Sequence, residues 1–250
     1  KLIIWSVLSL SLVILFIFLQ EYFLFLYTSQ PIEQSLAMDK SGFFLFNLQN
    51  FYPFVFKTFL NISYIENTWI GNDPFKVQQF LPFIPKMHQH IDQYYPGTKL
   101  GITEYSYMGM GHASGGIAQA DALGIFGKQG LYFANYWGAV TDYIKVGFDL
   151  FRNYDGKGGK FGNTSILSET NDINSTSVHA SIEGDNDSLV HVIAMNKNQD
   201  SAVTVTINLS SASRTYRSAK VWAFDNSGAA IRQLKSVRVV PGFGTIFCNE

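Results

Sequence analysis

Glu104 is the residue whose setting in the sequence most clearly suggests chemistry. It ends an apolar run that begins at Leu100, and a glycine-rich loop follows at residues 109–116. An isolated glutamate at the end of a strand is most often only solvated. In barrel enzymes, however, the catalytic residues lie at the carboxyl ends of parallel strands, each followed by a loop and a helix. The spacing predicts that Glu104 is presented at the mouth of a site.

Aromatic residues and one histidine accompany this carboxylate. Tyr105 and Tyr107 follow it, Trp137 ends the next apolar stretch, and His112 lies in the glycine-rich loop. Aromatic rings offer platforms for the faces of sugar rings, and sugar hydrolysis requires fixed carboxylates. The combination favours a sugar-cleaving site, with the four residues around Glu104 predicted to bind substrate.

Other candidate motifs do not fit their patterns. The sixth position from Gly109 is Ser114 rather than Gly or Ala, so the loop is not a dinucleotide fingerprint. His88 and His90 are two apart on an expected helix and face different directions. The acidic segment 183–187 lacks the calcium-loop pattern. We expect neither a metal site nor a cofactor.

Composition excludes some classes of function. Only 15% of the 250 residues are charged, and the formal net charge is -1. Binding to nucleic acid needs a basic surface, so we expect no nucleic-acid partner. Cys248 is the single cysteine, which rules out a disulfide within the chain.

The first 60 residues differ from the rest. Residues 2–19 carry no charge, and about 18 apolar residues is the length at which a membrane span becomes a candidate. Asn-x-Ser/Thr acceptors occur at Asn61, Asn163, Asn174, Asn186 and Asn208. We expect residues 1–60 to be an apolar segment outside the functional fold, either a membrane anchor or an artefact of the gene boundary. The predicted location is extracellular, or membrane-anchored and facing outside.

Two kinds of pattern follow in the remaining chain. Residues 61–158 alternate helices with strands, which predicts parallel strands joined by crossovers. Residues 159–250 show short strands of alternating apolar residues separated by Asn, Asp, Ser and Gly, which predicts a β-sandwich. The expected fold class is α/β plus all-β. The expected helices span about 74–95, 116–128 and 143–154, and the expected strands span about 100–105, 130–137, 178–182, 189–195, 203–209, 219–224, 237–240 and 245–248.

Several motifs together resemble glycoside hydrolase family 44. They are Ile102-Thr-Glu-Tyr105, the stretch from His112 to Phe126, Tyr143-Ile-Lys145 and Arg152-Asn-Tyr-Asp-Gly-Lys-Gly158. The resemblance runs from near Tyr64 to about Phe247. It implies the C-terminal portion of a (β/α)₈ TIM barrel followed by a β-sandwich. It further implies retaining hydrolysis of internal bonds in β-1,4-glucans such as cellulose and xyloglucan.

The resemblance also implies roles for individual residues. Glu104 matches the family's catalytic nucleophile and Trp137 the tryptophan that lines its cleft, while Tyr105 and His112 match positions near that site. The family's acid/base glutamate follows an asparagine on an earlier strand, and no Asn-Glu pair precedes Glu104 in this sequence. A retaining mechanism needs two carboxylates. We therefore expect a fragment that is inactive alone.

Two alternatives from other classes remain open. The chain could be a non-catalytic carbohydrate-binding remnant that holds sugar without cleaving it. It could instead be a membrane-anchored surface protein whose sandwich mediates adhesion.

Overall fold

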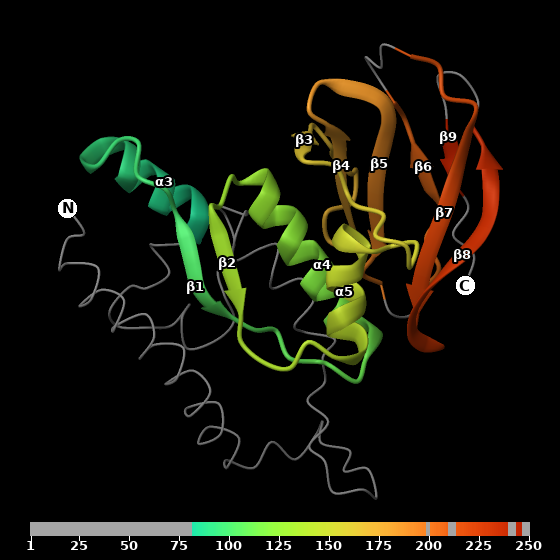
Figure 1. The fold of residues 1–250 in the computed structure, drawn as a ribbon, viewed down its shortest axis with the longest axis horizontal. Helices are drawn as coiled ribbons and strands as arrows, with labels where there is room; N and C mark the ends of the chain where they lie inside the picture. Colours follow the sequence, from blue (N-terminus) through green and yellow to red (C-terminus); the bar gives the residue numbers. More distant parts are fainter. Residues whose placement is uncertain (1–81, 199–200, 210–213, 240–243, 247–250) are drawn as a thin grey trace, which may run out of the picture. The chain divides into compact units, whose positions relative to one another are not determined.

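The computed structural model describes residues 82–198, 201–209, 214–239 and 244–246, which belong to one compact unit. The expected apolar segment 1–60 and the start of the first expected helix lie outside these residues. The first described part contains, in order, α3 (Phe83–Tyr94), β1 (Gly101–Tyr105), α4 (Ala113–Lys128), β2 (Phe133–Tyr136) and α5 (Asp142–Arg152) (Figure 1). None of the helices in the described part is both long enough and apolar enough to cross a membrane.

Strands β1 and β2 are parallel, as the alternation of helices and strands predicts. Gly101 pairs with Phe133, Ile102 with Ala134 and Tyr105 with Tyr136. Three steps along β1 therefore match two steps along β2, so β1 contains one extra residue between Ile102 and Tyr105. Such a bulge changes the direction of the side chains beside it and is common at barrel rims and near active sites.

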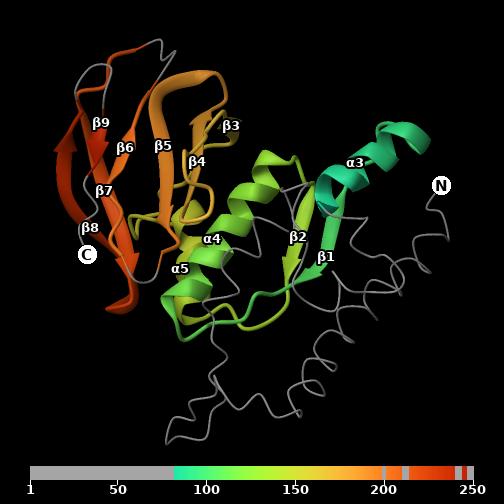
Figure 2. The same ribbon diagram turned by 180° about the vertical axis from the view of Figure 1, so that it is seen from behind.

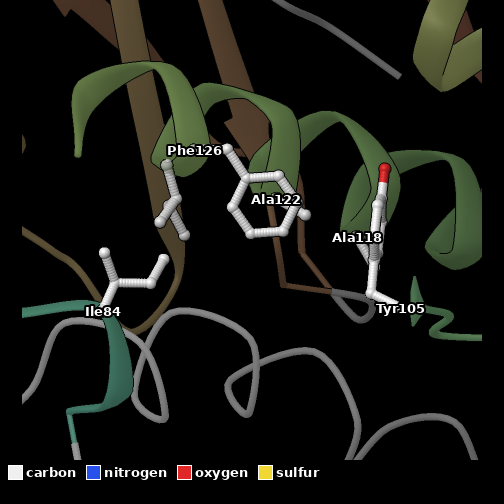
Figure 3. Packing of buried hydrophobic residues seen from close by; sticks show 6 residues of the cluster. Ile84, Tyr105, Ala118, Ala122 and Phe126 are labelled. Carbon is white, nitrogen blue, oxygen red and sulfur yellow. The ribbon is translucent and has the colours of Figure 1, made fainter. Parts of the chain in front are cut away.

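Helix α4 lies between two packed layers (Figures 1 and 2). One side packs with β1 and α3 in a core of Ile84, Tyr105, Ala118, Ala122, Ile125 and Phe126 (Figure 3). On its other side, Ala120 packs against Ile193 and Met195. Because both sides are covered, the helix is apolar almost all round rather than amphipathic, as expected for a buried helix.

Glycines let α4 and α5 approach closely. A Cβ at Gly116 would lie 2.7 Å from the carbonyl oxygen of Tyr143, and one at Gly147 would lie 2.7 Å from the carbonyl oxygen of Gly116. Real Cβ atoms do not come this close to such atoms. The absence of side chains at both positions thus sets the distance between the two helices.

The remaining strands form antiparallel pairs throughout the described residues. One sheet has the order β3 (Thr164–Ile166), β4 (Thr176–Glu183) and β5 (Asn186–Asn196). The strands β6 (Val205–Ile207) and β9 (Gly244–Ile246) form a second sheet, and β7 (Ser218–Asp225) and β8 (Gly228–Arg238) form a third. Helical and parallel elements followed by antiparallel strands agree with the expected α/β plus all-β class. The domain limits at 61–158 and 159–250 stay a prediction.

Two strands depart from the sequence-based expectation. Strand β3 was not expected, and β8 begins at Gly228, whereas its sequence pattern predicts a strand only from residue 237. Most of β8 is exposed, so it lacks the apolar alternation that identifies a strand. The start of β8 is instead set by its pairing with β7 across a tight turn, in which Asp225 pairs with Gly228.

His191 should make the stability of the folded state depend on pH. It lies on β5 opposite Ser181, with its ring 5.8 Å from that of Tyr154 and 6.2 Å from that of Phe161. Burial lowers the pKa of His191 below its ordinary 6.5, and the negative charge of Glu183 opposes this only in part.

Below pH 6.5 the unfolded chain therefore binds a proton that the folded chain takes up less readily. The free energy of unfolding should fall as the pH drops from 6.5 towards the lower folded pKa. Replacing His191 by Gln should make the free energy of unfolding depend less on pH in the range just below 6.5. Urea denaturation at several pH values measures both curves, and identical slopes would show that His191 does not cause the effect.

Candidate active site

Glu104 is the penultimate residue of β1 and is half-buried. It lies within the register shift between Ile102 and Tyr105. Leu100, Ile102, Tyr105 and Tyr107 all pack on or against the core beneath α4. Strict alternation along a strand would put Tyr105 on the face opposite Ile102. The bulge thus allows the tyrosines to pack with the core, while Glu104 remains next to them at the end of the strand.

Trp137 reaches the same end of the parallel pair. It directly follows β2, and its backbone N–H donates to the carbonyl oxygen of Tyr105 at 2.8 Å. The residue is 55% exposed. The structure therefore brings Glu104 and an exposed indole to the carboxyl ends of two neighbouring parallel strands, where the sequence predicts them together.

Tyr105 and Tyr107 lie differently from the expectation that their rings flank Glu104 at an open mouth. Tyr105 is 7% exposed, and its ring meets Phe126 and Tyr136 edge-on, with centroids 5.0 and 5.6 Å away. Its hydroxyl accepts a hydrogen bond from Gln119 Nε2 at 2.8 Å. The ring of Tyr105 sits in the core, and Tyr107 is half-buried and packs against it. Direct contact with substrate stays a prediction for both.

Burial also decides the ionisation of these phenols. Desolvation raises the pKa of Tyr105, although the hydrogen bond from Gln119 lowers it in part. Desolvation raises the pKa of Tyr107 well above its ordinary value, and the nearby charge of Asp121 adds to this. Both hydroxyls are therefore neutral at physiological pH and act as hydrogen-bonding groups.

The loop after β1 has a backbone that few residues adopt. Met108 has φ 56° and Gly109 has φ 75°, and the Met108 N–H donates to Ser106 Oγ at 3.3 Å. A Cβ at Gly115, in the first turn of α4, would overlap the carbonyl group of Gly109. The glycines of this loop therefore allow a tight turn before the helix, in which the backbone at Gly109 lies close against the first turn of α4.

His112 caps helix α4. Its Nδ1 accepts hydrogen bonds from the backbone N–H of Ser114 at 3.2 Å and from the Ser114 hydroxyl at 2.8 Å. A nitrogen that accepts both bonds carries no proton, so the ring proton is on Nε2. The helix begins three residues before the expected Gly116, because His112 satisfies an N–H of the first turn. Its predicted role towards substrate remains untested.

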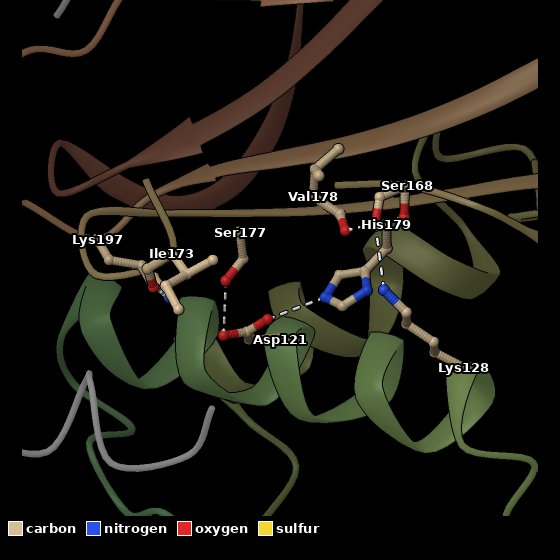
Figure 4. A network of polar contacts seen from close by, with 8 residues as sticks. All are labelled: Asp121, Lys128, Ser168, Ile173, Ser177, Val178, His179 and Lys197. Carbon is tan, nitrogen blue, oxygen red and sulfur yellow. Dashed lines mark hydrogen bonds and ion pairs between the residues drawn. The ribbon is translucent and has the colours of Figure 1, made fainter. Parts of the chain in front are cut away.

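A buried polar cluster joins α4 to β4, and the sequence did not single it out (Figure 4). Asp121 is 1% exposed and accepts hydrogen bonds from Ser177 Oγ and from His179 Nε2, each at 2.9 Å. One signal was available: residues 177, 179 and 181 are polar and alternate with the apolar residues 178, 180 and 182, which places all three on one face.

This cluster contains Ser, His and Asp but is not arranged as a catalytic triad. In a triad the serine donates to the histidine, whereas Ser177 donates to the carboxylate of Asp121. Ser177 and His179 are also only 4% and 6% exposed. The cluster therefore holds α4 against β4 instead of offering a nucleophile. Among the described residues, no group of three or more His, Cys, Asp or Glu is placed to hold a metal ion.

Comparisons with known proteins agree on one group of enzymes. No protein-family model matches the chain. It is 46% identical over 177 residues to Endoglucanase A of Paenibacillus lautus, which covers 70% of this chain and 25% of the relative.

Solved structures give the same result. The structure of Cel44A, a family 44 endoglucanase from Clostridium thermocellum, matches with a TM-score of 0.72 and 46% identity, over 76% of this chain and 37% of that one. A Paenibacillus polymyxa xyloglucanase of family 44 matches with a TM-score of 0.72 and 41% identity, again over 76% of this chain and 37% of that one.

This chain thus spans a quarter of the length of the curated relative and less than two fifths of each of these structures. The resemblance to glycoside hydrolase family 44 is confirmed: the chain is related to the endoglucanases of that family and matches part of their length.

Proposed function

We propose that this chain carries the nucleophile half of a retaining β-1,4-glucan hydrolase. The observation that carries the proposal is the position of Glu104 at the end of β1, beside the exposed Trp137 at the end of β2. Related proteins are named endoglucanase and xyloglucanase. The proposed substrate is therefore a β-1,4-glucan polysaccharide, and the proposed location is outside the cell or on a membrane surface facing outside.

The proposal includes the architecture around this site. Strands β1 and β2 with helices α4 and α5 would be the last units of a (β/α)₈ barrel, and the three antiparallel sheets would form the β-sandwich. Parallel strands occur almost only in sheets covered by helices, and a parallel pair needs further strands beside it. A position at the carboxyl ends of such strands is where barrels bind substrate.

The proposed chemistry assigns one step to Glu104. Its carboxylate attacks the anomeric carbon and the bond from that carbon to the leaving oxygen breaks, which gives a glycosyl ester on Glu104. A second carboxyl group protonates the leaving oxygen and then activates the water that hydrolyses the ester. Because no Asn-Glu pair precedes Glu104 in the sequence, we place this second group outside the 250 residues. The chain alone should then bind glucan chains without cleaving them.

Trp137 gives the test of this proposal. Calorimetric titration with cellohexaose or a xyloglucan oligosaccharide should detect binding, while a reducing-sugar assay detects no cleavage. Trp137→Ala should weaken binding about tenfold or more, because it removes the ring platform. The melting temperature should change little, since the side chain is largely exposed.

Tyr132→Ala is the matched control. Tyr132 is 65% exposed and lies just before the opposite end of β2, with Lys99 Nζ 4.1 Å from its ring centroid. Its removal should leave the affinity unchanged. Equal losses in the two variants, or no binding by the unmodified chain, would contradict the proposed site.

A further inference from the structure

Helix α4 connects the candidate site to the sheet of β3, β4 and β5. It begins at Ala113, directly after the loop that follows Glu104, and its middle carries the buried Asp121. Both oxygens of this carboxylate are engaged by β4, one by Ser177 and the other by His179 (Figure 4). A position in the middle of α4 is thus fixed by two side chains from a strand more than 50 residues further along the chain.

The same stretch of α4 also contacts the end of β1. Gln119, two residues before Asp121, donates to the hydroxyl of Tyr105 and is fully buried. Tyr107, whose ring centroid is 6.0 Å from that of Tyr105, packs against the core that contains Ala118 and Ala122 of the same helix. Both tyrosines that follow Glu104 therefore lie against the part of the helix that β4 fixes.

We infer that Ser177 and His179 are positioning residues for the Glu104 site, acting through Asp121 and helix α4. This inference rests on the proposed function for the role of Glu104. It gives the antiparallel sheet a part in shaping the site, in addition to covering the helix.

The packing of α4 explains why a polar anchor is needed. The faces of the helix are lined by small residues such as Ala118, Ala120 and Ala122, which interlock weakly with their neighbours. Apolar contacts of this kind are not directional. A buried carboxylate with two donors is directional, because a shift of the helix would leave its charge without partners in a medium of low polarity. The cluster should fix the rotation and height of α4, and with them the end of β1.

Strand β4 supplies a matched pair of variants. Ser177 and Ser181 lie on the same face and are both buried, at 4% and 0% exposed. Ser177 Oγ donates to Asp121, whereas Ser181 Oγ has no hydrogen-bond partner among the described residues. Ser177→Ala and Ser181→Ala remove the same atom from the same strand, but only the first changes the anchor.

The primary measurement is amide hydrogen exchange of the Trp137 N–H, whose bond to Tyr105 closes the strand end beside Glu104. In Ser177→Ala this exchange should become about tenfold faster, as expected when a bond to a charged group is lost. The exchange rates of amides in the β7–β8 pair should change less, and Ser181→Ala should leave the exchange rate of the Trp137 N–H unchanged. Equal rates in the two variants, or the same acceleration at Trp137 and in β7–β8, would overturn the inference.

Two substitutions of His179 provide a second, independent pair of variants. His179→Gln keeps an N–H donor that can reach Asp121, whereas His179→Leu removes it. The glutamine variant should retain slow exchange at Trp137 and the leucine variant should lose it. If both lose it to the same extent, the role of His179 is filling space alone, and it is not a positioning residue.

Oligosaccharide titration separates this inference from the proposed function. Ser177→Ala should lower the affinity for cellohexaose, and Ser181→Ala should not. If no form of the chain binds the sugar, the proposed function fails, and the exchange data still decide whether β4 positions the end of β1. If the unmodified chain binds and Ser177→Ala binds equally well, the positioning role fails while the proposed function stands.

Discussion

Glu104→Gln is expected to abolish covalent capture of an activated sugar by this chain. The reagent is a 2-deoxy-2-fluoro β-cellobioside with dinitrophenolate as leaving group. Because dinitrophenolate leaves without being protonated, the acid that we propose lies outside this chain is not required for the first step. The carboxylate of Glu104 should form an ester with the anomeric carbon and release dinitrophenolate, and the fluorine slows hydrolysis of the ester. Mass spectrometry of the digested protein should locate the added sugar on Glu104.

The glutamine variant should show no adduct, since a neutral amide is a poor nucleophile at this position. In a longer protein that carries both carboxylates, the same change should lower turnover by at least about 1,000-fold and leave sugar binding largely intact. Glu169→Gln is the control, because Glu169 is exposed and lies outside the site. An adduct on another residue, or equal labelling of the Glu104→Gln variant, would remove Glu104 from the nucleophile role.

Gly124→Ala should destabilise the folded protein although alanine favours helices. Gly124 lies in α4 over the imidazole of His179, and a Cβ there would overlap the ring. The ring cannot move aside without losing its bond to Asp121, whose charge is buried. Overpacking together with a weakened buried hydrogen bond should lower the free energy of unfolding by about 3 kcal/mol.

Gly127→Ala should stabilise the folded protein, in contrast to Gly124→Ala. Gly127 lies in the same helix and is exposed, and a Cβ there would meet nothing within 4 Å. The substitution should raise the free energy of unfolding by up to about 1 kcal/mol through helix propensity alone. Urea unfolding of the two variants measures the difference. If Gly124→Ala were as stable as Gly127→Ala, the close approach of α4 and β4 would be contradicted.

Local patterns determined much of this protein. The apolar run ending at Glu104 predicts β1, Pro96 and Gly97 predict the end of α3, and the glycine-rich loop predicts the start of α4 within three residues. These features follow from backbone geometry and from the spacing of apolar residues, which act over a few positions in the sequence. The parallel pairing of β1 with β2 also follows, because the helix between them requires a crossover.

Tertiary structure alone decided which side chains meet. The bulge in β1 places Tyr105 in the core and Tyr107 half-buried against it, although their spacing favours a place beside Glu104 at an open mouth. Such a bulge arises from fitting β1 to β2 and α4, and it leaves no local signature in the sequence. The cluster of Asp121 with Ser177 and His179 joins residues 56 and 58 positions apart. A local pattern carries no information on contacts over that distance, so the sequence identified the carboxylate expected to react, and the packing of α4 against β4 revealed the residues that position it.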